Sequence, residues 1–191
     1  MTDWDRIWQR LGGSRGGQPD LTMVRFVSRT FGPWLAGRIF LDIGSGTGAN
    51  SHWLEQRGAD VVSIDPSHHC RAHYHFSVDQ YVARMIYPDF NCVLDINTLC
   101  HNPDAELDYG AIRQMLKNGG WFYCVTPHLD HHNWEQNGLR NVGEGQAFTR
   151  YASEWDLRKM LRHFTSVSIR EQLEPAGAHL YVKSWCVEAQ K

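Results

Sequence analysis

Three glycines that alternate with small residues are the part of this sequence best suited to bind a ligand. Gly44, Gly46 and Gly48 follow a short apolar run, 39–43, and precede a segment with helical character. Glycine has no Cβ atom, so the backbone of such a strand-to-helix turn lets a ligand approach closely. Asp65 follows the next apolar run, where an acid can accept hydrogen bonds from both hydroxyls of a ribose. Together these residues predict a nucleoside-containing cofactor.

The spacing of the glycines and a further acid narrow the class of cofactor. The order G-x-G-x-G differs from the G-x-G-x-x-G of dinucleotide sites, where a helix N-terminus faces a pyrophosphate. Asp42 stands just before the first glycine. A carboxylate at this point repels a diphosphate and favours a cofactor that carries an ammonium group.

Asp42 and the three glycines resemble motif I of the class I S-adenosylmethionine-dependent methyltransferases. Residues 87–101 resemble the strand-four block of that family, and residues 116–122 resemble its entry to the fifth strand. The resemblance covers about residues 39–188 and implies S-adenosylmethionine as the cofactor. The cofactor-binding residues that it implies are Asp42, Gly44, Ser45, Gly46, Gly48, Asp65, Pro66, Asp79, Gln80 and Asn97.

Apolar runs and helical patterns alternate after residue 38, which favours an α/β fold with a parallel sheet and helices on both faces. The last two predicted strands form a hairpin. A nicotinamide-binding fold would instead repeat the strand-helix-strand pattern in its second half. The hairpin resembles the methyltransferase sheet, whose last strand runs antiparallel between its neighbours. We therefore predict a Rossmann-like, seven-stranded, mostly parallel sheet with an antiparallel last strand. The predicted strands are 38–43, 60–64, 72–78, 90–96, 121–125, 165–173 and 179–188.

Two segments add to this fold. Residues 1–37 contain two helical patterns separated by a glycine-rich stretch, and we predict an N-terminal helical lid segment there. A helix that only packs against the sheet is the alternative. Residues 38–191 form the predicted methyltransferase domain. Within it, residues 127–146 show little periodicity and several glycines, so we predict a loop insertion at the active site.

Two histidines are candidate catalytic residues. Methyl transfer from a sulfonium is an in-line displacement, so the protein mainly positions the donor and the acceptor. A general base is needed only when the acceptor is a hydroxyl or an ammonium group. His101 and His128 follow the predicted strands 90–96 and 121–125, at the sheet edge where ligands bind. The alternative for His101 is a polar residue at a helix N-terminus.

Metal binding is a second hypothesis for the loop that contains His128. Asp130, His131 and His132 follow closely, and imidazole and carboxylate groups can ligate a divalent metal. Magnesium, which some natural-product methyltransferases use, prefers carboxylates and water. We therefore predict no metal and interpret the loop as a polar segment that contacts the substrate.

Composition limits the partners and the location. The formal net charge is −2 and no block of lysine or arginine occurs, so we expect no nucleic-acid partner. The first residues are polar and acidic and no apolar run has membrane-spanning length, so we expect no membrane partner. Five scattered cysteines without a C-x-x-C pair indicate a reduced, cytoplasmic protein. The sequence does not specify an oligomeric state.

The leading hypothesis is therefore methylation of a small-molecule acceptor with S-adenosylmethionine as the donor. The segment after strand 90–96 lacks the Asp/Asn-Pro-Pro-Tyr/Phe tetrapeptide of amino-methylating DNA enzymes. Two alternatives remain open at this stage. One is an NAD-dependent oxidoreductase with a Rossmann fold, and the other is a non-catalytic protein that binds S-adenosylmethionine.

Overall fold

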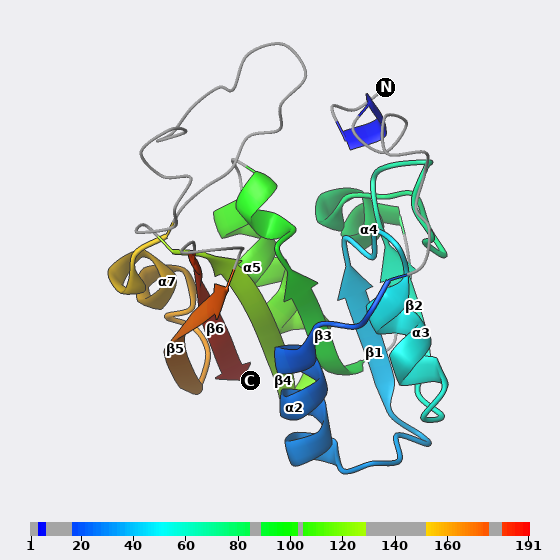
Figure 1. Cartoon of the computed structure of the whole chain (residues 1–191), viewed down its shortest axis with the longest axis horizontal. Helices are drawn as coiled ribbons and strands as arrows, with labels where there is room; N and C mark the ends of the chain where they lie inside the picture. The colour runs from blue at the N-terminus through cyan, green and yellow to red at the C-terminus, as the bar shows by residue number, and fades with distance from the viewer. Residues whose placement is uncertain (1–3, 7–16, 85–88, 103–104, 129–151, 176–180) are drawn as a thin grey trace.

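The computed structural model describes residues 4–6, 17–84, 89–102, 105–128, 152–175 and 181–191 (Figure 1). In this part of the chain six strands form one sheet, in the order β2-β1-β3-β4-β6-β5. β6 runs antiparallel between β4 and β5, and the other neighbours are parallel. The predicted Rossmann-like α/β fold with an antiparallel last strand is confirmed. The strands are β1 (Ile39–Ile43), β2 (Asp60–Ile64), β3 (Phe90–Ile96), β4 (Leu116–Pro127), β5 (Ser166–Pro175) and β6 (Tyr181–Gln190).

The prediction of seven strands is wrong, because residues 72–78 do not form a strand among the described residues. Tyr74 makes an isolated bridge to the end of β2, and Val78 already begins a helix. The side chain of His73 explains the difference. Its Nδ1 accepts a hydrogen bond from the backbone N–H of Ser63 at 3.1 Å. The imidazole thus satisfies a donor at the outer edge of β2 that a neighbouring strand would otherwise pair with.

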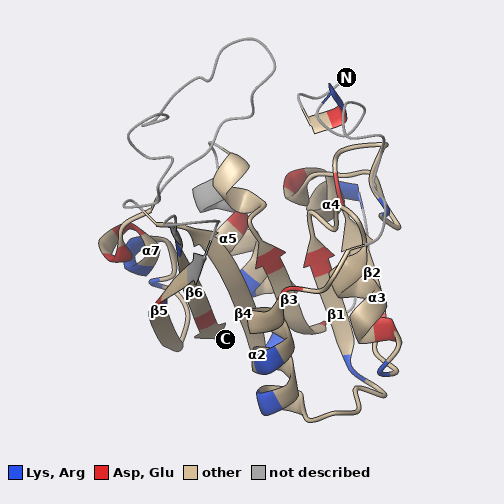
Figure 2. Cartoon of the chain, viewed as in Figure 1, with Lys and Arg blue, Asp and Glu red and all other residues tan. Residues whose placement is uncertain are grey.

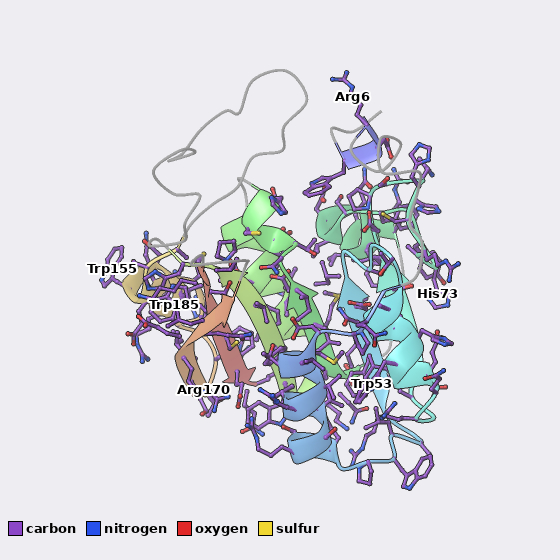
Figure 3. The ribbon with its side chains drawn as sticks, in the orientation of Figure 1. Arg6, Trp53, His73, Trp155, Arg170 and Trp185 are labelled. Carbon is purple, nitrogen blue, oxygen red and sulfur yellow. The ribbon has the colours of Figure 1, made fainter. Side chains whose placement is uncertain are left out.

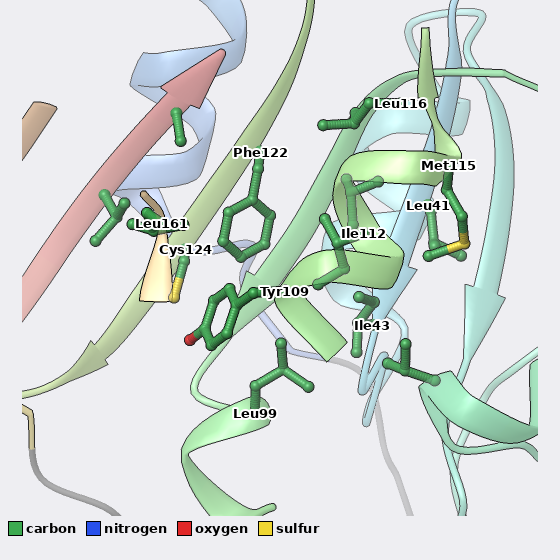
Figure 4. Packing of buried hydrophobic residues seen from close by; sticks show 14 of the residues in the cluster. Leu41, Ile43, Leu99, Tyr109, Ile112, Met115, Leu116, Phe122, Cys124 and Leu161 are labelled. Atoms are coloured by element: carbon green, nitrogen blue, oxygen red, sulfur yellow. The ribbon is translucent and has the colours of Figure 1, made fainter. Parts of the chain in front are cut away.

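Helices cover both faces of the sheet, as predicted (Figure 1). On one face lie α2 (Leu21–Phe31) and α3 (Ala49–Glu55). On the other lie α4 (Val78–Arg84), α5 (Ala105–Met115) and α7 (Glu154–Met160). The strands alternate between the two core clusters: in β4, Phe122 and Cys124 pack with α5, whereas Tyr123 and Val125 pack with α2. Figure 4 shows the cluster around α5.

Helix α2 begins where the sequence provides a cap. The Asp20 carboxylate accepts hydrogen bonds from the backbone N–H groups of Thr22 (2.9 Å) and Met23 (2.8 Å). The N–H of Asp20 itself donates to Oδ1 of Asn50 at 2.9 Å. Because Asn50 belongs to the first turn of α3, this bond ties α2 to the helix that follows the glycine-rich loop.

The cysteines behave as small apolar residues. All five are buried and free of disulfides, as the scattered sequence positions predicted. Among the described residues, no helix is long and apolar enough to cross a membrane.

Candidate active site

A cavity of about 480 Å³ lies at the carboxyl ends of β1, β2 and β3, where open parallel sheets bind ligands. The last residues of these strands, Ile43, Ile64 and Ile96, all line it. Figure 2 shows acidic residues at the ends of β1 and β3, close to this edge. The predicted site residues that line the cavity are Gly44, Gly46, Asp65, Pro66, Asp79, Asn97 and His101. The predicted residues that stand outside the lining are Asp42, Ser45, Gly48, Gln80 and His128.

The glycine-rich loop requires glycine for steric reasons. Gly44, Gly46 and Gly48 have φ angles of 67°, 50° and 77°, in the left-handed region that L-residues rarely adopt. A Cβ atom on Gly44 would lie 2.1 Å from Oγ1 of Thr98, which is far inside contact distance. The loop therefore passes directly against the segment that follows β3, and it exposes backbone to the cavity.

Asp65 links the loop to the end of β2. Its Oδ2 accepts a hydrogen bond from the N–H of Gly46 at 3.1 Å, and its Oδ1 accepts one from the N–H of Ser67 at 2.9 Å. The residue is only 6% exposed, yet it lines the cavity. A carboxylate held at two points in this way is oriented before a ligand arrives.

Several predicted residues outside the lining hold the loops of the site in place. The hydroxyl of Ser45 donates to the carbonyl of Arg71 at 2.8 Å, and Gly48 is the N-cap of α3. Gln80 accepts a hydrogen bond from the N–H of Ser77 at 3.2 Å through its side-chain oxygen. Direct cofactor contact by these residues stays a prediction.

Two buried carboxyl groups lie beneath the cavity. Asp42 accepts a hydrogen bond from the hydroxyl of Ser51 at 2.6 Å, and burial raises its pKa to about 6. Asp95, on β3, accepts hydrogen bonds from the N–H groups of Thr98 and Leu99 at 3.0 Å each. Burial raises the pKa of Asp95 to about 6 as well. Asp95 therefore fixes the segment that packs against Gly44.

We expect Asp42→Asn to alter the pH dependence of stability. The folded pKa of about 6 lies above the usual 3.8, so the folded state binds this proton more tightly than the unfolded state. The protonated Asp42 carboxyl therefore stabilises the folded wild type. This contribution to the free energy of unfolding is complete below about pH 4 and is lost as the pH rises through about 6. The amide of the variant cannot ionise, so the variant does not lose this contribution. The difference in free energy of unfolding, variant minus wild type, should therefore be about 1–3 kcal/mol larger at pH 7 than at pH 4. Urea unfolding measures this, and an equal difference at both pH values would contradict it.

Asn97 has an unusual backbone conformation at the cavity wall. Its φ of 55° is the only positive value among the described residues other than glycine. Asparagine tolerates this region better than most side chains, and such outliers gather at functional sites. The N–H of Asn97 donates to the carbonyl of Val125 at 2.8 Å, so β4 holds the turn.

His101 lines the cavity from the short 3₁₀ helix Leu99–His101. Its ring meets the ring of Trp4 edge to face, with centroids 4.7 Å apart. The next residue, Asn102, donates from Nδ2 to Oδ2 of Asp108 at 2.5 Å. Trp4 and Thr98 also line the cavity. Asn102 and Asp108 line it as well, although the sequence alone did not place them in the site.

His128 lies away from this cavity. It is 7% exposed, and its ring lies 4.3 Å from that of Trp185, between centroids. Its Nε2 is 3.4 Å from Oε1 of Glu171 on β5. Trp185 is labelled in Figure 3, beside α7 and far from the N-terminal Arg6. A catalytic role for His128 stays a prediction that this position does not favour.

The hypothesis of a metal-binding loop falls largely outside the described residues, because 129–151 are not among them. Within the described part of the chain, no group of three or more His, Cys, Asp or Glu side chains is arranged to hold a metal ion. Most of the predicted insertion 127–146 is likewise outside the described residues.

Comparison with known proteins assigns the family. A family model described as a methyltransferase domain matches residues 17–181. The chain belongs to this family. It is an S-adenosylmethionine-dependent methyltransferase, as the resemblance predicted, and the nicotinamide oxidoreductase alternative is wrong. No curated protein sequence matches the chain.

Solved methyltransferases share the fold of this family member. One from Mesorhizobium loti is 17% identical, with a TM-score of 0.66, over 85% of this chain and 95% of that chain. One from Archaeoglobus fulgidus is 13% identical, with a TM-score of 0.65, over 90% and 95%. The 1,6-didemethyltoxoflavin-N1-methyltransferase of Burkholderia thailandensis, with bound S-adenosylhomocysteine, is 19% identical, with a TM-score of 0.63, over 87% and 75%.

The residues of the cavity fit S-adenosylmethionine, the cofactor of this family. The glycine-rich loop leaves no Cβ atoms where a nucleoside would approach, and Asp65 presents a fixed carboxylate beside it. The described lining residues include Asp65, Asp79 and Asp108 and contain no lysine or arginine. This charge complements a ligand that carries a sulfonium and an ammonium group.

Proposed function

We propose that this methyltransferase acts on a small-molecule acceptor. The observation that supports the proposal is that the glycine-rich loop, Asp65, His101 and Trp4 all line one cavity. The donor and the acceptor would therefore share one partly open space of about 480 Å³. The described lining has no lysine or arginine to receive the phosphates of a nucleic acid, which further favours a small acceptor.

On the donor side, Gly44 and Gly46 would allow close approach of the cofactor, and Asp65 would accept hydrogen bonds from its ribose. Asp79 lines the cavity in the first turn of α4, where the family resemblance implies contact with the adenine edge. When bound, S-adenosylmethionine supplies a methyl group already activated for in-line displacement.

On the acceptor side, His101 would accept the proton that a hydroxyl or ammonium acceptor must lose. Residues 4–6, which belong to the predicted N-terminal lid segment 1–37, would exclude water from the space beside His101. The Asp5 carboxylate accepts hydrogen bonds from the hydroxyl of Ser67 at 2.7 Å and from the N–H of His68 at 3.1 Å. These bonds hold Trp4 against His101 at the cavity.

Two measurements test the proposal. Isothermal titration calorimetry should show binding of both S-adenosylmethionine and S-adenosylhomocysteine to the purified chain. A transfer assay with tritiated methyl donor should then label pools of small metabolites, and should not label oligonucleotides or denatured proteins. Transfer to the macromolecules alone would overturn the small-molecule assignment, and failure to bind either cofactor would overturn the donor assignment.

We expect His101→Ala to lower turnover more than cofactor affinity. Loss of a general base typically costs about 100-fold or more in rate. The dissociation constant of S-adenosylmethionine should change by less than about threefold, because the proposed role of His101 is to accept a proton and not to bind the donor. Steady-state kinetics with the acceptor found in the transfer assay, together with calorimetry, separate the two effects. The same pair of measurements on His128→Ala tests the second predicted base, and unchanged kinetics in either variant would remove that histidine from catalysis.

A further inference from the structure

The charged groups of the cavity are all of one sign. Asp65, Asp79 and Asp108 line it, and no lysine or arginine stands among the described lining residues. Inside a partly enclosed site, carboxylates attract cations more strongly than they do in water, because less solvent screens them. The three carboxylates would repel an acceptor that carries a carboxylate or phosphate, and no lysine or arginine of the described lining would pair with it. The same carboxylates would attract a cationic acceptor.

The donor does not account for all three carboxylates. Asp65 and Asp79 lie at the end of β2 and on α4, on the side assigned to the donor. Asp108 comes from α5, and its carboxyl group accepts a hydrogen bond from Asn102, the residue after His101. Its carboxyl group is therefore placed on the acceptor side.

Packing of α5 fixes the position of Asp108. The neighbouring Tyr109 and the next turn's Ile112 belong to the core cluster shown in Figure 4. Asp108 itself is 4% exposed, and Asn102 donates a hydrogen bond to its Oδ2 at 2.5 Å. A buried carboxylate that a side-chain amide orients toward a cavity is prepared to receive a donor or a cation.

Trp4 supplies a second group that attracts cations on the same side. It lines the cavity, and it meets His101 edge to face at 4.7 Å between ring centroids. The face of an indole ring attracts ammonium groups more strongly than any other side-chain ring. A carboxylate and an indole beside a histidine form a wall suited to a protonated amine.

We propose that the methyl acceptor is a small amine, attracted as its ammonium form by the Asp108 carboxylate and the Trp4 ring. This inference rests on the proposed function. The ammonium nitrogen first gives one proton to His101. Its lone pair then forms the new bond to the methyl carbon while the carbon–sulfur bond of the donor breaks, and that electron pair stays on sulfur. The products are a methylated ammonium and S-adenosylhomocysteine, with the proton on His101 released to solvent.

Matched amine and carboxylate probes test the charge preference. Calorimetry with the enzyme loaded with S-adenosylhomocysteine would compare tryptamine with indole-3-acetate, tyramine with 4-hydroxyphenylacetate, and histamine with imidazole-4-acetate. We expect each amine to bind at least about tenfold more tightly than its carboxylate partner. A carboxylate that binds as tightly as its amine would overturn the inference, as would dissociation constants above about 10 mM for all three amines.

Variants identify the residues responsible. Asp108→Asn removes the charge and keeps the shape, and should weaken amine binding about tenfold while leaving carboxylate binding and S-adenosylhomocysteine binding unchanged. Trp4→Leu should weaken amine binding selectively as well, which provides a second variant if the first does not fold. Asp60→Asn, an exposed acid at the start of β2, is the matched control and should change neither. Equal weakening of both probe classes in Asp108→Asn would show a purely structural role and overturn the assignment.

The cofactor measurement keeps the two proposals separable. If S-adenosylhomocysteine fails to bind the wild-type enzyme, the proposed function fails. If S-adenosylhomocysteine binds and the amines show no preference, only the inference about the acceptor fails.

Discussion

Replacement of Asp65 by alanine is expected to weaken the binding of S-adenosylmethionine by about 10- to 100-fold, the usual loss when charged hydrogen bonds disappear. Asp65 lies at the end of β2, lines the cavity and is held by the N–H groups of Gly46 and Ser67. The alanine variant removes the proposed ribose acceptor and also releases the glycine-rich loop. Isothermal titration calorimetry measures the loss.

Two controls separate these contributions. Asp65→Asn keeps one side-chain oxygen of the same shape, so it should retain part of the loop contacts and lose less affinity than the alanine variant. Asp60→Ala removes a carboxylate from the other end of the same strand, far from the cavity, and should leave affinity unchanged. If Asp65→Ala binds S-adenosylmethionine as tightly as the wild type, the ribose assignment is wrong.

Part of the cavity lining was predictable because its residues follow strands directly. Gly44 comes one residue after β1, and Asp65 comes one residue after β2. Parallel strands place their carboxyl ends at one edge of a sheet, so sequence order alone brings these residues together. The same reasoning placed Asn97 and His101 beside β3, and all four line the cavity.

The positions of Asp108 and of Trp4 beside His101 were not predictable in this way. Asp5 accepts hydrogen bonds from Ser67 and His68, more than sixty positions along the chain, and these bonds tie the segment that carries Trp4 to the cavity. Asp108 faces the cavity because its neighbours on α5 pack into the core. Such contacts depend on how distant elements pack, which neither spacing nor periodicity in one sequence specifies.

His128 shows that a position directly after a strand does not by itself place a residue in the cavity. It follows β4, as His101 follows β3, yet its ring packs against Trp185 and faces Glu171. β6 inserts antiparallel beside β4, so the residue after β4 has partners on β5 and β6 rather than on the cavity side. The terminal hairpin was predicted from the sequence. Its position beside β4, which surrounds His128 with residues of β5 and β6, becomes visible only in the order of the strands.

Replacement of Gly44 by alanine is expected to destabilise the fold and to abolish cofactor binding. The φ of 67° costs an L-residue about 1–2 kcal/mol, and overpacking against Thr98 adds about 1–3 kcal/mol. For a chain of this size the midpoint of thermal unfolding should fall by about 5–15 °C. Circular dichroism measures the midpoint, and calorimetry measures the lost binding of S-adenosylmethionine.

Gly110→Ala is the matched control, because among the described residues no atom beyond its chain neighbours and the backbone of α5 lies within 4 Å of the Cβ that it would add. It should raise stability slightly through better helix propensity. Thr98→Gly removes the three atoms that lie 2.1, 2.2 and 2.6 Å from the added Cβ of Gly44→Ala. Combined with Gly44→Ala, it should therefore cost less than the sum of the two single substitutions. Additive costs would show that the left-handed backbone alone, and not the contact with Thr98, requires glycine at this position.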